Sequence, residues 1–162
     1  MSDGIKLLIV DDEIKFLNSI AKRLEMRDFD VTKATNGQEA LEIAGREKFD
    51  LVLLDLKMPG LNGKQVLEIL KRKHKFLEVI IITGHGSLDS AVECTRLGAF
   101  DYLPKPYEFE SLLEKLQKAY EARLEKKFEA DQDRLEKISK LATGHSALGI
   151  LRELRKLDDE EK

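Results

Sequence analysis

The sequence has little of what disulfide-bonded or membrane-embedded proteins require. Cys94 is the single cysteine among 162 residues, so the chain forms no internal disulfide. No apolar run approaches the roughly 20 residues that a transmembrane helix needs. The segment MSDGIK leads directly into a short apolar run, with neither a basic leader nor a cleavage site. These absences predict a cytoplasmic protein with no membrane partner.

An excess of one sign of charge is also lacking. The formal net charge is −3, although 36% of the residues are charged. From residue 123 onward, ten basic and ten acidic residues cancel. Because nucleic-acid binding needs a basic face, we do not expect nucleic acid as a partner. A transcriptional regulator that binds DNA through this C-terminal segment remains an alternative.

The sequence does contain a regular alternation of short apolar runs and longer amphipathic segments. Continuous runs of Leu, Ile and Val bounded by polar residues are typical of strands buried on both faces. Between the runs, apolar residues recur every three or four positions, for example from Ile14 to Leu24, as in helices that cover a sheet. This pattern predicts an α/β fold with a parallel five-stranded sheet between helices. The runs are residues 7–10, 29–31, 51–54, 79–82 and 100–103.

The fifth amphipathic segment is longer than one domain can cover. It begins near Glu108 and extends to about Leu141, with Leu135 and Ile138 continuing the apolar stripe. Residues 143–146 interrupt the pattern, and apolar residues at 148, 151, 154 and 157 predict a short last helix. We therefore expect a domain over residues 1–122 and a helical extension over 123–162. The first part of the stripe consists of Leu112, Leu116, Tyr120, Leu124 and Phe128.

A projecting helix would leave the stripe of this extension in water, at about 1.5–3 kcal/mol for each large apolar side chain. Two chains can bury the stripe as a coiled coil, which predicts a homodimer through the C-terminal helix. The alternative is a hairpin within one chain, formed if the last helix folds back on the fifth.

Polar residues gather where the predicted strands end. Asp11 and Asp12 follow the first run, Asp55 ends the third, Thr83 ends the fourth, and Lys105 follows the fifth. Ligands of open α/β sheets bind at this edge. Three like charges need neutralisation, and an all-oxygen set suits Mg²⁺ or Mn²⁺. A carboxylate beside such a cation can attack phosphorus, so the pattern indicates phosphoryl transfer.

Each of these residues has an ordinary explanation when it is taken alone. Asp12 could cap a helix, Thr83 could simply end a strand, and Lys105 could be a surface lysine. Their joint occurrence at the strand ends of one alternating chain favours a functional site.

Four segments in this order resemble the receiver domains of two-component response regulators. The resemblance covers about residues 4–122, and the form of the third segment is most similar to receivers of the nitrogen-regulator type. It implies a flavodoxin-like, doubly wound five-stranded sheet with strand order 2-1-3-4-5. It also implies a stand-alone phosphoprotein of signal transduction that is no enzyme beyond its own phosphorylation and dephosphorylation. The segments are LIVDDE (8–13), LDLKMPG (54–60), ITGHG (82–86) and YLPKP (102–106).

The resemblance implies a role for each acidic residue. Asp55 accepts a phosphoryl group from a sensor histidine kinase or a phosphotransfer protein. Asp12 and Asp55 hold Mg²⁺ directly, Asp11 does so directly or through water, and the backbone carbonyl of Lys57 is a further ligand. The side chains of Lys57 and His85 lie on opposite rims of the site, where the resemblance suggests that they tune the phosphoryl lifetime.

The resemblance also implies a conformational switch. Lys105 contacts the phosphoryl oxygens, and the peptide bond between Lys105 and Pro106 is cis. Thr83 moves to donate a hydrogen bond to the phosphoryl group, and Tyr102 turns inward to fill the vacated space. The expected output is control of an unknown downstream protein or of dimerisation.

Two further alternatives use the same acidic residues. An aspartyl-phosphate phosphatase would use Asp55 as its nucleophile, but such enzymes resemble one another in an Asp-x-Asp signature, and this chain has Lys57 at its third position. A degenerate receiver would no longer accept phosphate, and the intact acidic set argues against that interpretation.

Overall fold

A five-stranded parallel sheet forms the centre of the molecule. The computed structural model describes residues 4–58, 60–84 and 88–142, together with residues 149, 151, 152, 155 and 156. The strand order is β2-β1-β3-β4-β5, which confirms the predicted flavodoxin-like fold class. The strands are β1 (Lys6–Val10), β2 (Asp30–Ala34), β3 (Leu51–Asp55), β4 (Glu78–Thr83) and β5 (Asp101–Pro104).

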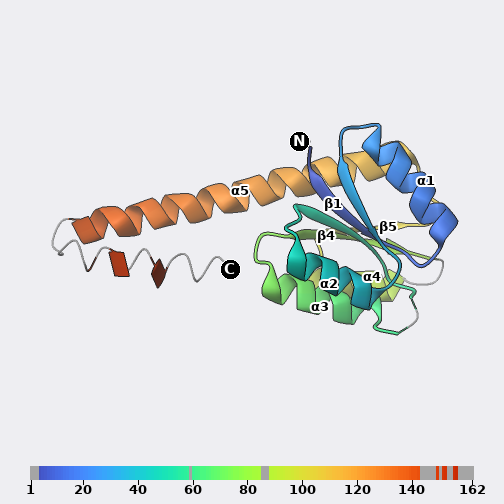
Figure 1. Cartoon of the computed structure of the whole chain (residues 1–162), viewed down its shortest axis with the longest axis horizontal. Helices are drawn as coiled ribbons and strands as arrows, with labels where there is room; N and C mark the ends of the chain where they lie inside the picture. The colour runs from blue at the N-terminus through green and yellow to red at the C-terminus, as the bar shows by residue number, and fades with distance from the viewer. Residues whose placement is uncertain are drawn as a thin grey trace.

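Helices cover both faces of this sheet. Helices α1 and α5 lie on one face and α2, α3 and α4 on the other (Figure 1). In the described part of the chain, no helix combines the length and apolar character needed to cross a membrane. The helices are α1 (Ile14–Glu25), α2 (Gly37–Arg46), α3 (Gly63–Lys73), α4 (Leu88–Arg96) and α5 (Phe109–Ala142).

The continuous apolar runs become strands because both faces of the sheet are covered. Successive side chains of a strand point to opposite faces. In β1, Leu7 and Ile9 therefore join the core under α1 and α5, whereas Leu8 and Val10 join the core under α2 to α4. Every residue of β3 and β4 is buried.

Two predictions from the apolar pattern were wrong in detail. The second strand covers Asp30–Ala34, whereas the pattern placed it at residues 29–31. Phe29 precedes the strand and belongs to the turn after α1. Its backbone N–H donates to the carbonyl of Leu24 at 3.2 Å, and its ring is buried. Ile14, predicted on the buried stripe of α1, is 59% exposed because it begins that helix on the solvent side.

Helix α5 projects far beyond the sheet, as the sequence predicted (Figure 1). Leu112 and Leu116 are fully buried, but Leu124 is 48% exposed and Phe128 is 64% exposed. Residues spaced by four advance about 40° around a helix with 3.6 residues per turn. The predicted single stripe therefore spirals away from the domain, and its second half lies on a different face. The break at residues 143–146 lies outside the described residues, as does most of the predicted last helix.

Two glycines shape the loop that leads from β3 to α3 beside the carboxyl edge. Gly60 has a φ of +82°, a conformation that L side chains rarely adopt. A Cβ atom on Gly63 would lie 2.7 Å from the Cα of Leu56, so only glycine lets α3 begin directly against this loop. Asn62 and Gln65 then form a capping box at the start of the helix.

Candidate functional site

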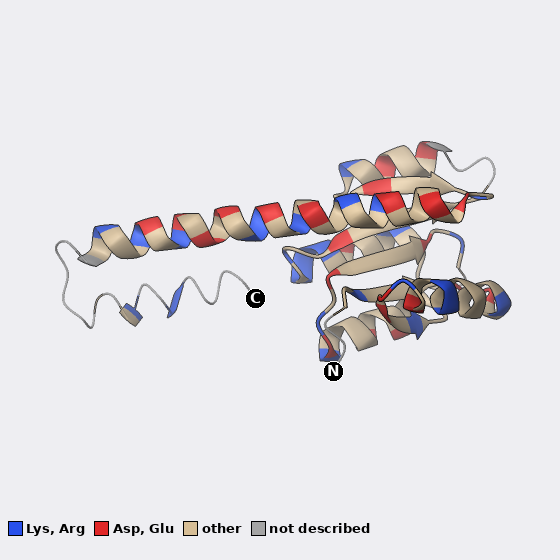
Figure 2. Cartoon of the chain, turned by 90° about the horizontal axis from the view of Figure 1, so that it is seen from above, with Lys and Arg blue, Asp and Glu red and all other residues tan. Residues whose placement is uncertain are grey.

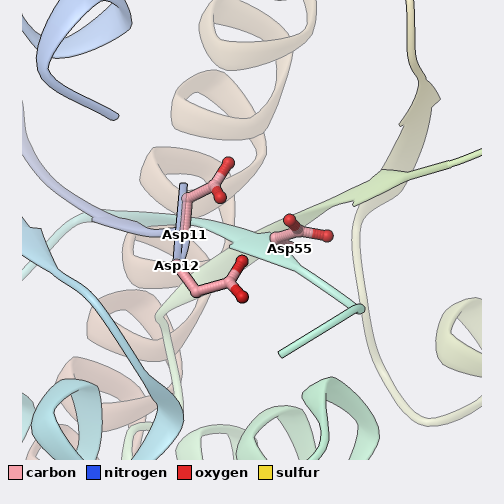
Figure 3. Close-up of side chains that lie close together, drawn as sticks. All are labelled: Asp11, Asp12 and Asp55. Carbon is pink, nitrogen blue, oxygen red and sulfur yellow. The ribbon is translucent and has the colours of Figure 1, made fainter. Parts of the chain in front are cut away.

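Three carboxylates converge at the carboxyl edge of the sheet. Strands β1 and β3 are direct neighbours, with Val10 beside Leu54, so the residues that follow them meet. One carboxylate oxygen from each of Asp11, Asp12 and Asp55 lies within 4.8 Å of the others. Figure 3 shows Asp11 and Asp12 at the end of β1 and Asp55 at the end of β3. The predicted convergence of the acidic residues is confirmed.

Backbone donors orient the two buried carboxylates. Asp11 and Asp55 are 2% and 5% exposed, whereas Asp12 is exposed. The N–H of Glu13 donates to Oδ1 of Asp11 at 2.9 Å, and the N–H of Lys57 donates to Oδ1 of Asp55 at 3.1 Å. In both residues the other oxygen, Oδ2, is left to face a cation. Asp12 does not cap α1, because the cap position belongs to Glu13.

Lys105 supplies that cation from the end of β5. Its Nζ lies 3.4 Å from Oδ2 of Asp11 and 3.5 Å from Oδ2 of Asp55. Burial lowers the pKa of this ammonium, but Asp55 and Asp11 outweigh burial, so the pKa lies above its usual range. The single ammonium of Lys105 cannot neutralise two buried carboxylates. The cluster therefore keeps a net negative charge, and Asp12 adds to it.

The pKa of Asp55 reflects the opposing effects of burial, negative charge and positive charge at this site. Burial raises the pKa of the Asp55 carboxyl and Asp11 adds to the rise, while the N–H of Lys57 and the ammonium of Lys105 oppose it. The net direction is upward. The protein alone therefore does not fully compensate the ionised form of Asp55, and an added cation would favour it.

Two neighbours position Lys105. Its backbone N–H donates to the carbonyl of Thr83 at 2.7 Å, and the peptide bond to Pro106 is cis, as the resemblance implied. Its Nζ lies 4.5 Å from the ring centroid of Phe16 on α1, a cation–π contact. Phe16 was not among the predicted site residues, although an aromatic residue one turn after the first acidic cluster was an available signal.

Thr83 and Tyr102, the proposed switch pair, lie on adjacent strands. Thr83 is buried at the end of β4 beside Pro104 of β5, and Tyr102 lies beside Ile81. Tyr102 is half-buried and packs against the core under α2 to α4. The side chain of Lys57 is exposed at the rim, and the predicted rim residue His85 lies outside the described residues.

Tyr107 is a second residue near the site that the sequence pattern did not predict. It follows Pro106, and its ring meets that of Phe16 edge to face at 6.2 Å between centroids. Its hydroxyl is buried and makes no hydrogen bond to the described residues. Burial raises the pKa of this hydroxyl, and Asp11 adds to the rise. Tyr107 and Phe16 help to line an open cavity of about 470 Å³ between α1 and the loop that follows β5.

The donor set fits a hard divalent cation. Three carboxylates contribute oxygen only, and the described part of the chain adds no His or Cys to the cluster. Mg²⁺ and Mn²⁺ prefer such ligands and are commonly held by one or two carboxylates together with water. Asp11, Asp12 and Asp55 are therefore the residues that could hold the ion.

Comparison with known proteins shows the family to which this fold belongs. The chain matches the response regulator receiver domain family over residues 7–117, and it belongs to that family. It is 37% identical over 119 residues to a putative NtrX-like response regulator of Rickettsia felis, covering 72% of this chain and 25% of the relative. It is 36% identical over 119 residues to the DNA-binding transcriptional regulator NtrC of Escherichia coli, covering 74% and 25%.

A solved structure of a receiver domain protein has the same fold. The receiver domain protein from Clostridium thermocellum superposes with a TM-score of 0.70 at 36% identity, covering 72% of this chain and 94% of that one. The chain spans about a quarter of the length of the curated relatives that it matches. The family therefore identifies a receiver of two-component phosphorelay signalling.

Proposed function

We propose that this receiver accepts a phosphoryl group on Asp55 from the phosphohistidine of a sensor histidine kinase or a phosphotransfer protein. The observation that carries the proposal is the placement of Lys105 between Asp11 and Asp55, with Asp12 beside them. Mg²⁺, or Mn²⁺ in its place, is the proposed cofactor, held by the three carboxylates and the backbone carbonyl of Lys57.

In the proposed reaction, a carboxylate oxygen of Asp55 attacks the phosphorus atom. The bond between phosphorus and the donor's imidazole nitrogen breaks, and its electron pair leaves with the imidazole. Lys105 contacts a phosphoryl oxygen and offsets the charge that develops there. A cation held by these carboxylates would further neutralise the phosphoryl oxygens. The N–H of Lys57 holds Oδ1 of Asp55 in place throughout.

The reaction would end in a switch and not in turnover of an external substrate. Thr83 is proposed to donate a hydrogen bond to the new phosphoryl group, and Tyr102 on the adjacent strand is proposed to move into the space that Thr83 leaves. A phosphoryl group shifts a conformational equilibrium only if the two states bind it differently. The proposed role is therefore that of a cytoplasmic signalling protein, with only its own phosphorylation and dephosphorylation catalysed.

The proposed outputs are a downstream protein and a homodimer that forms through the C-terminal helix. Blue and red residues alternate along α5 in Figure 2, so neither sign of charge dominates the projecting segment. This alternation supports a protein partner over nucleic acid, which needs a cationic face.

Intact-mass spectrometry with acetyl phosphate and Mg²⁺ tests the acceptor. The protein is expected to gain one phosphoryl group, and Asp55→Asn is expected to abolish the gain, because an amide is a poor nucleophile. Asp50→Asn, at the opposite edge of the sheet, is the matched control and is expected to be phosphorylated normally. A phosphorylated Asp55→Asn variant would exclude Asp55 as the acceptor.

Amide NMR spectra of the Thr83→Ala variant test the switch. The variant is expected to gain the phosphoryl group but not to show the shifts at Tyr102 that accompany phosphorylation of the wild type. Identical spectra for the two phosphorylated proteins would refute the coupling between Thr83 and Tyr102.

A further inference from the structure

The side chain of Lys105 is only partly fixed by the carboxylates that attract it. Its Nζ lies 3.4 Å from Oδ2 of Asp11 and 3.5 Å from Oδ2 of Asp55, whereas charge-assisted hydrogen bonds are about 2.7–2.9 Å long. The hydrogen bond to the carbonyl of Thr83 holds the backbone of Lys105, but a long flexible stem separates that backbone from Nζ. The side chain is 24% exposed, so water competes for its ammonium. The position of this cation therefore depends on contacts from outside the acidic cluster.

Phe16 provides such a contact from a different element. Nζ of Lys105 lies over the Phe16 ring, 4.5 Å from its centroid, where the negative face of the ring attracts a cation. The carboxylates come from the ends of β1 and β3, whereas Phe16 belongs to the first turn of α1. The next residue, Leu17, is 1% exposed and anchors this turn on the core. The ring is therefore carried by a firmly packed part of the helix.

Tyr107 packs against Phe16 and restricts the orientation of its ring. The two rings meet at 83° with 6.2 Å between their centroids, the edge-to-face arrangement that aromatic pairs prefer. Both side chains are half-buried and pack against the core under α1 and α5. Because Tyr107 follows Lys105 by two residues, the loop that presents the ammonium also holds the ring that the ammonium contacts.

We propose that Phe16 is a positioning residue of the acceptor site. The face of its ring holds the ammonium of Lys105 at the acidic cluster, where the ammonium meets the phosphoryl group that Asp55 accepts. This inference rests on the proposed phosphoryl transfer, and it adds a residue that acts through Lys105 and not on the phosphoryl group itself. A charged group accelerates a reaction most when it is already in place as charge develops. The ring therefore affects the rate of phosphorylation and leaves the identity of the acceptor unchanged.

The first test separates the aromatic face of Phe16 from its apolar bulk. Phe16→Leu keeps an apolar side chain at this place on α1 but removes the ring. The second-order rate constant for phosphorylation by acetyl phosphate with Mg²⁺ is expected to fall about two- to fivefold, because the cation–π contact is lost. Phe16→Tyr keeps the ring and is expected to react at the wild-type rate. Intact-mass time courses give both rate constants, and a Phe16→Leu variant that reacts as fast as the wild type would overturn the proposal.

Tyr120→Leu is the matched control for the loss of an aromatic side chain. Tyr120 is half-buried and packs against the same core, but it lies on α5, one turn before Arg123, which contacts the amino edge of the sheet. This substitution is expected to lower the free energy of unfolding without slowing phosphorylation. Equal slowing by Tyr120→Leu and Phe16→Leu would assign the effect to packing, and the role of Phe16 at the site would be refuted.

A double-mutant cycle with Lys105→Met tests whether Phe16 acts through Lys105. Lys105→Met removes the ammonium and is expected to slow the reaction, so its residual phosphorylation is followed over hours. Adding Phe16→Leu to this variant is expected to cause no further slowing, because the ring no longer has a cation to hold. If Phe16→Leu slows phosphorylation by the same factor in both backgrounds, the ring acts independently of Lys105 and the proposal fails.

Proton NMR tests the contact itself in the unphosphorylated protein without metal. Protons over the face of an aromatic ring resonate upfield, so the ε-methylene protons of Lys105 are expected upfield of those of the exposed Lys22. The shift is expected to persist in Phe16→Tyr and to disappear in Phe16→Leu. Its absence from the wild type would overturn the proposal whether or not Asp55 accepts a phosphoryl group. Phosphorylation of Asp55→Asn, in contrast, would refute the acceptor and leave this shift in place.

Discussion

The two edges of the sheet both contain buried carboxylates, but they differ in how those charges are compensated. At the amino edge, Asp50 meets Arg123, and Glu78 meets Lys126 at 2.6 Å and Lys71 at 3.9 Å. The nitrogen of Lys71 also donates to a backbone carbonyl, and burial lowers the pKa of its ammonium. Here the chain supplies its own cations, and the resulting pairs hold α3 and α5 against the sheet.

The carboxyl edge is left short of positive charge. Asp11, Asp12 and Asp55 share the cation of Lys105. Acids at one edge are therefore compensated within the fold, while acids at the other keep the negative charge that the proposed cation and phosphoryl group would meet. In this chain, the number of protein cations, and not burial alone, distinguishes the two acidic clusters.

The largest expected effect comes from removing the cations of the amino edge. Lys71→Met with Lys126→Met leaves Glu78 buried without a charge partner, and we expect the free energy of unfolding to fall by about 3 kcal/mol. Urea denaturation measures this loss. Lys64→Met, which removes the exposed partner of Glu93, is the control and should cost less than about 1 kcal/mol. If Lys64→Met lost as much unfolding free energy as the double variant, the pairs of Glu78 would be no more stabilising than an exposed ion pair.

The next effect is the stabilisation that Mg²⁺ confers at the carboxyl edge. At a concentration of 100 times the dissociation constant, a ligand that binds only the folded state adds about 2.7 kcal/mol. Asp12→Ala is expected to weaken Mg²⁺ binding at least about tenfold, and so to lose about half of this gain or more. Asp133→Ala, on the far end of α5, should retain it. Thermal unfolding with and without Mg²⁺ gives both values, and unchanged affinity in Asp12→Ala would remove that residue from the site.

The next prediction compares an Asp→Asn substitution at each edge of the sheet. The two substitutions are expected to change the free energy of unfolding by smaller amounts and in opposite directions. Burial raises the pKa of Asp55, so the stability that its protonated form contributes is present below pH 3.8 and is lost as pH rises through the folded pKa. Without metal, Asp55→Asn should therefore be more stable than the wild type at pH 7, with the gap closing toward pH 3.8.

Asp50→Asn breaks the pair with Arg123 and should be less stable than the wild type at pH 7. Urea titrations of both variants at pH 4 and pH 7 measure the comparison. If Asp55→Asn is less stable than the wild type at pH 7, the two edges do not differ in how their carboxylates are compensated.

The smallest effect is expected for Asp12→Ala in the absence of metal. Asp12 is exposed and caps no helix, so its removal takes away a like charge without leaving a group unpaired. The unfolding free energy should stay within about 0.5 kcal/mol of the wild type or rise slightly. A loss above about 1 kcal/mol would show that Asp12 also has a structural role.

The sequence by itself determined the sheet and the core of the site. Runs such as residues 51–54 predict buried strands, and parallel strands end at one common edge. Any residue that directly follows a run is therefore placed at that edge whatever the details of packing. This is why Asp11, Asp12, Asp55, Thr83 and Lys105 could be predicted at one edge, and the structure brings the three aspartates and Lys105 together there.

Tertiary structure alone decided which residues became partners across the molecule. Phe16 and Lys105, or Asp50 and Arg123, are distant in sequence, and no local period relates them. The exposure of Leu124 and Phe128 was settled in the same way. Their four-residue spacing matched that of Leu112 and Leu116, yet 40° of drift at each step carried them off the domain face. Local periodicity specifies that a helix has an apolar face, but the direction of its axis across the sheet specifies where the domain ends and that face meets water.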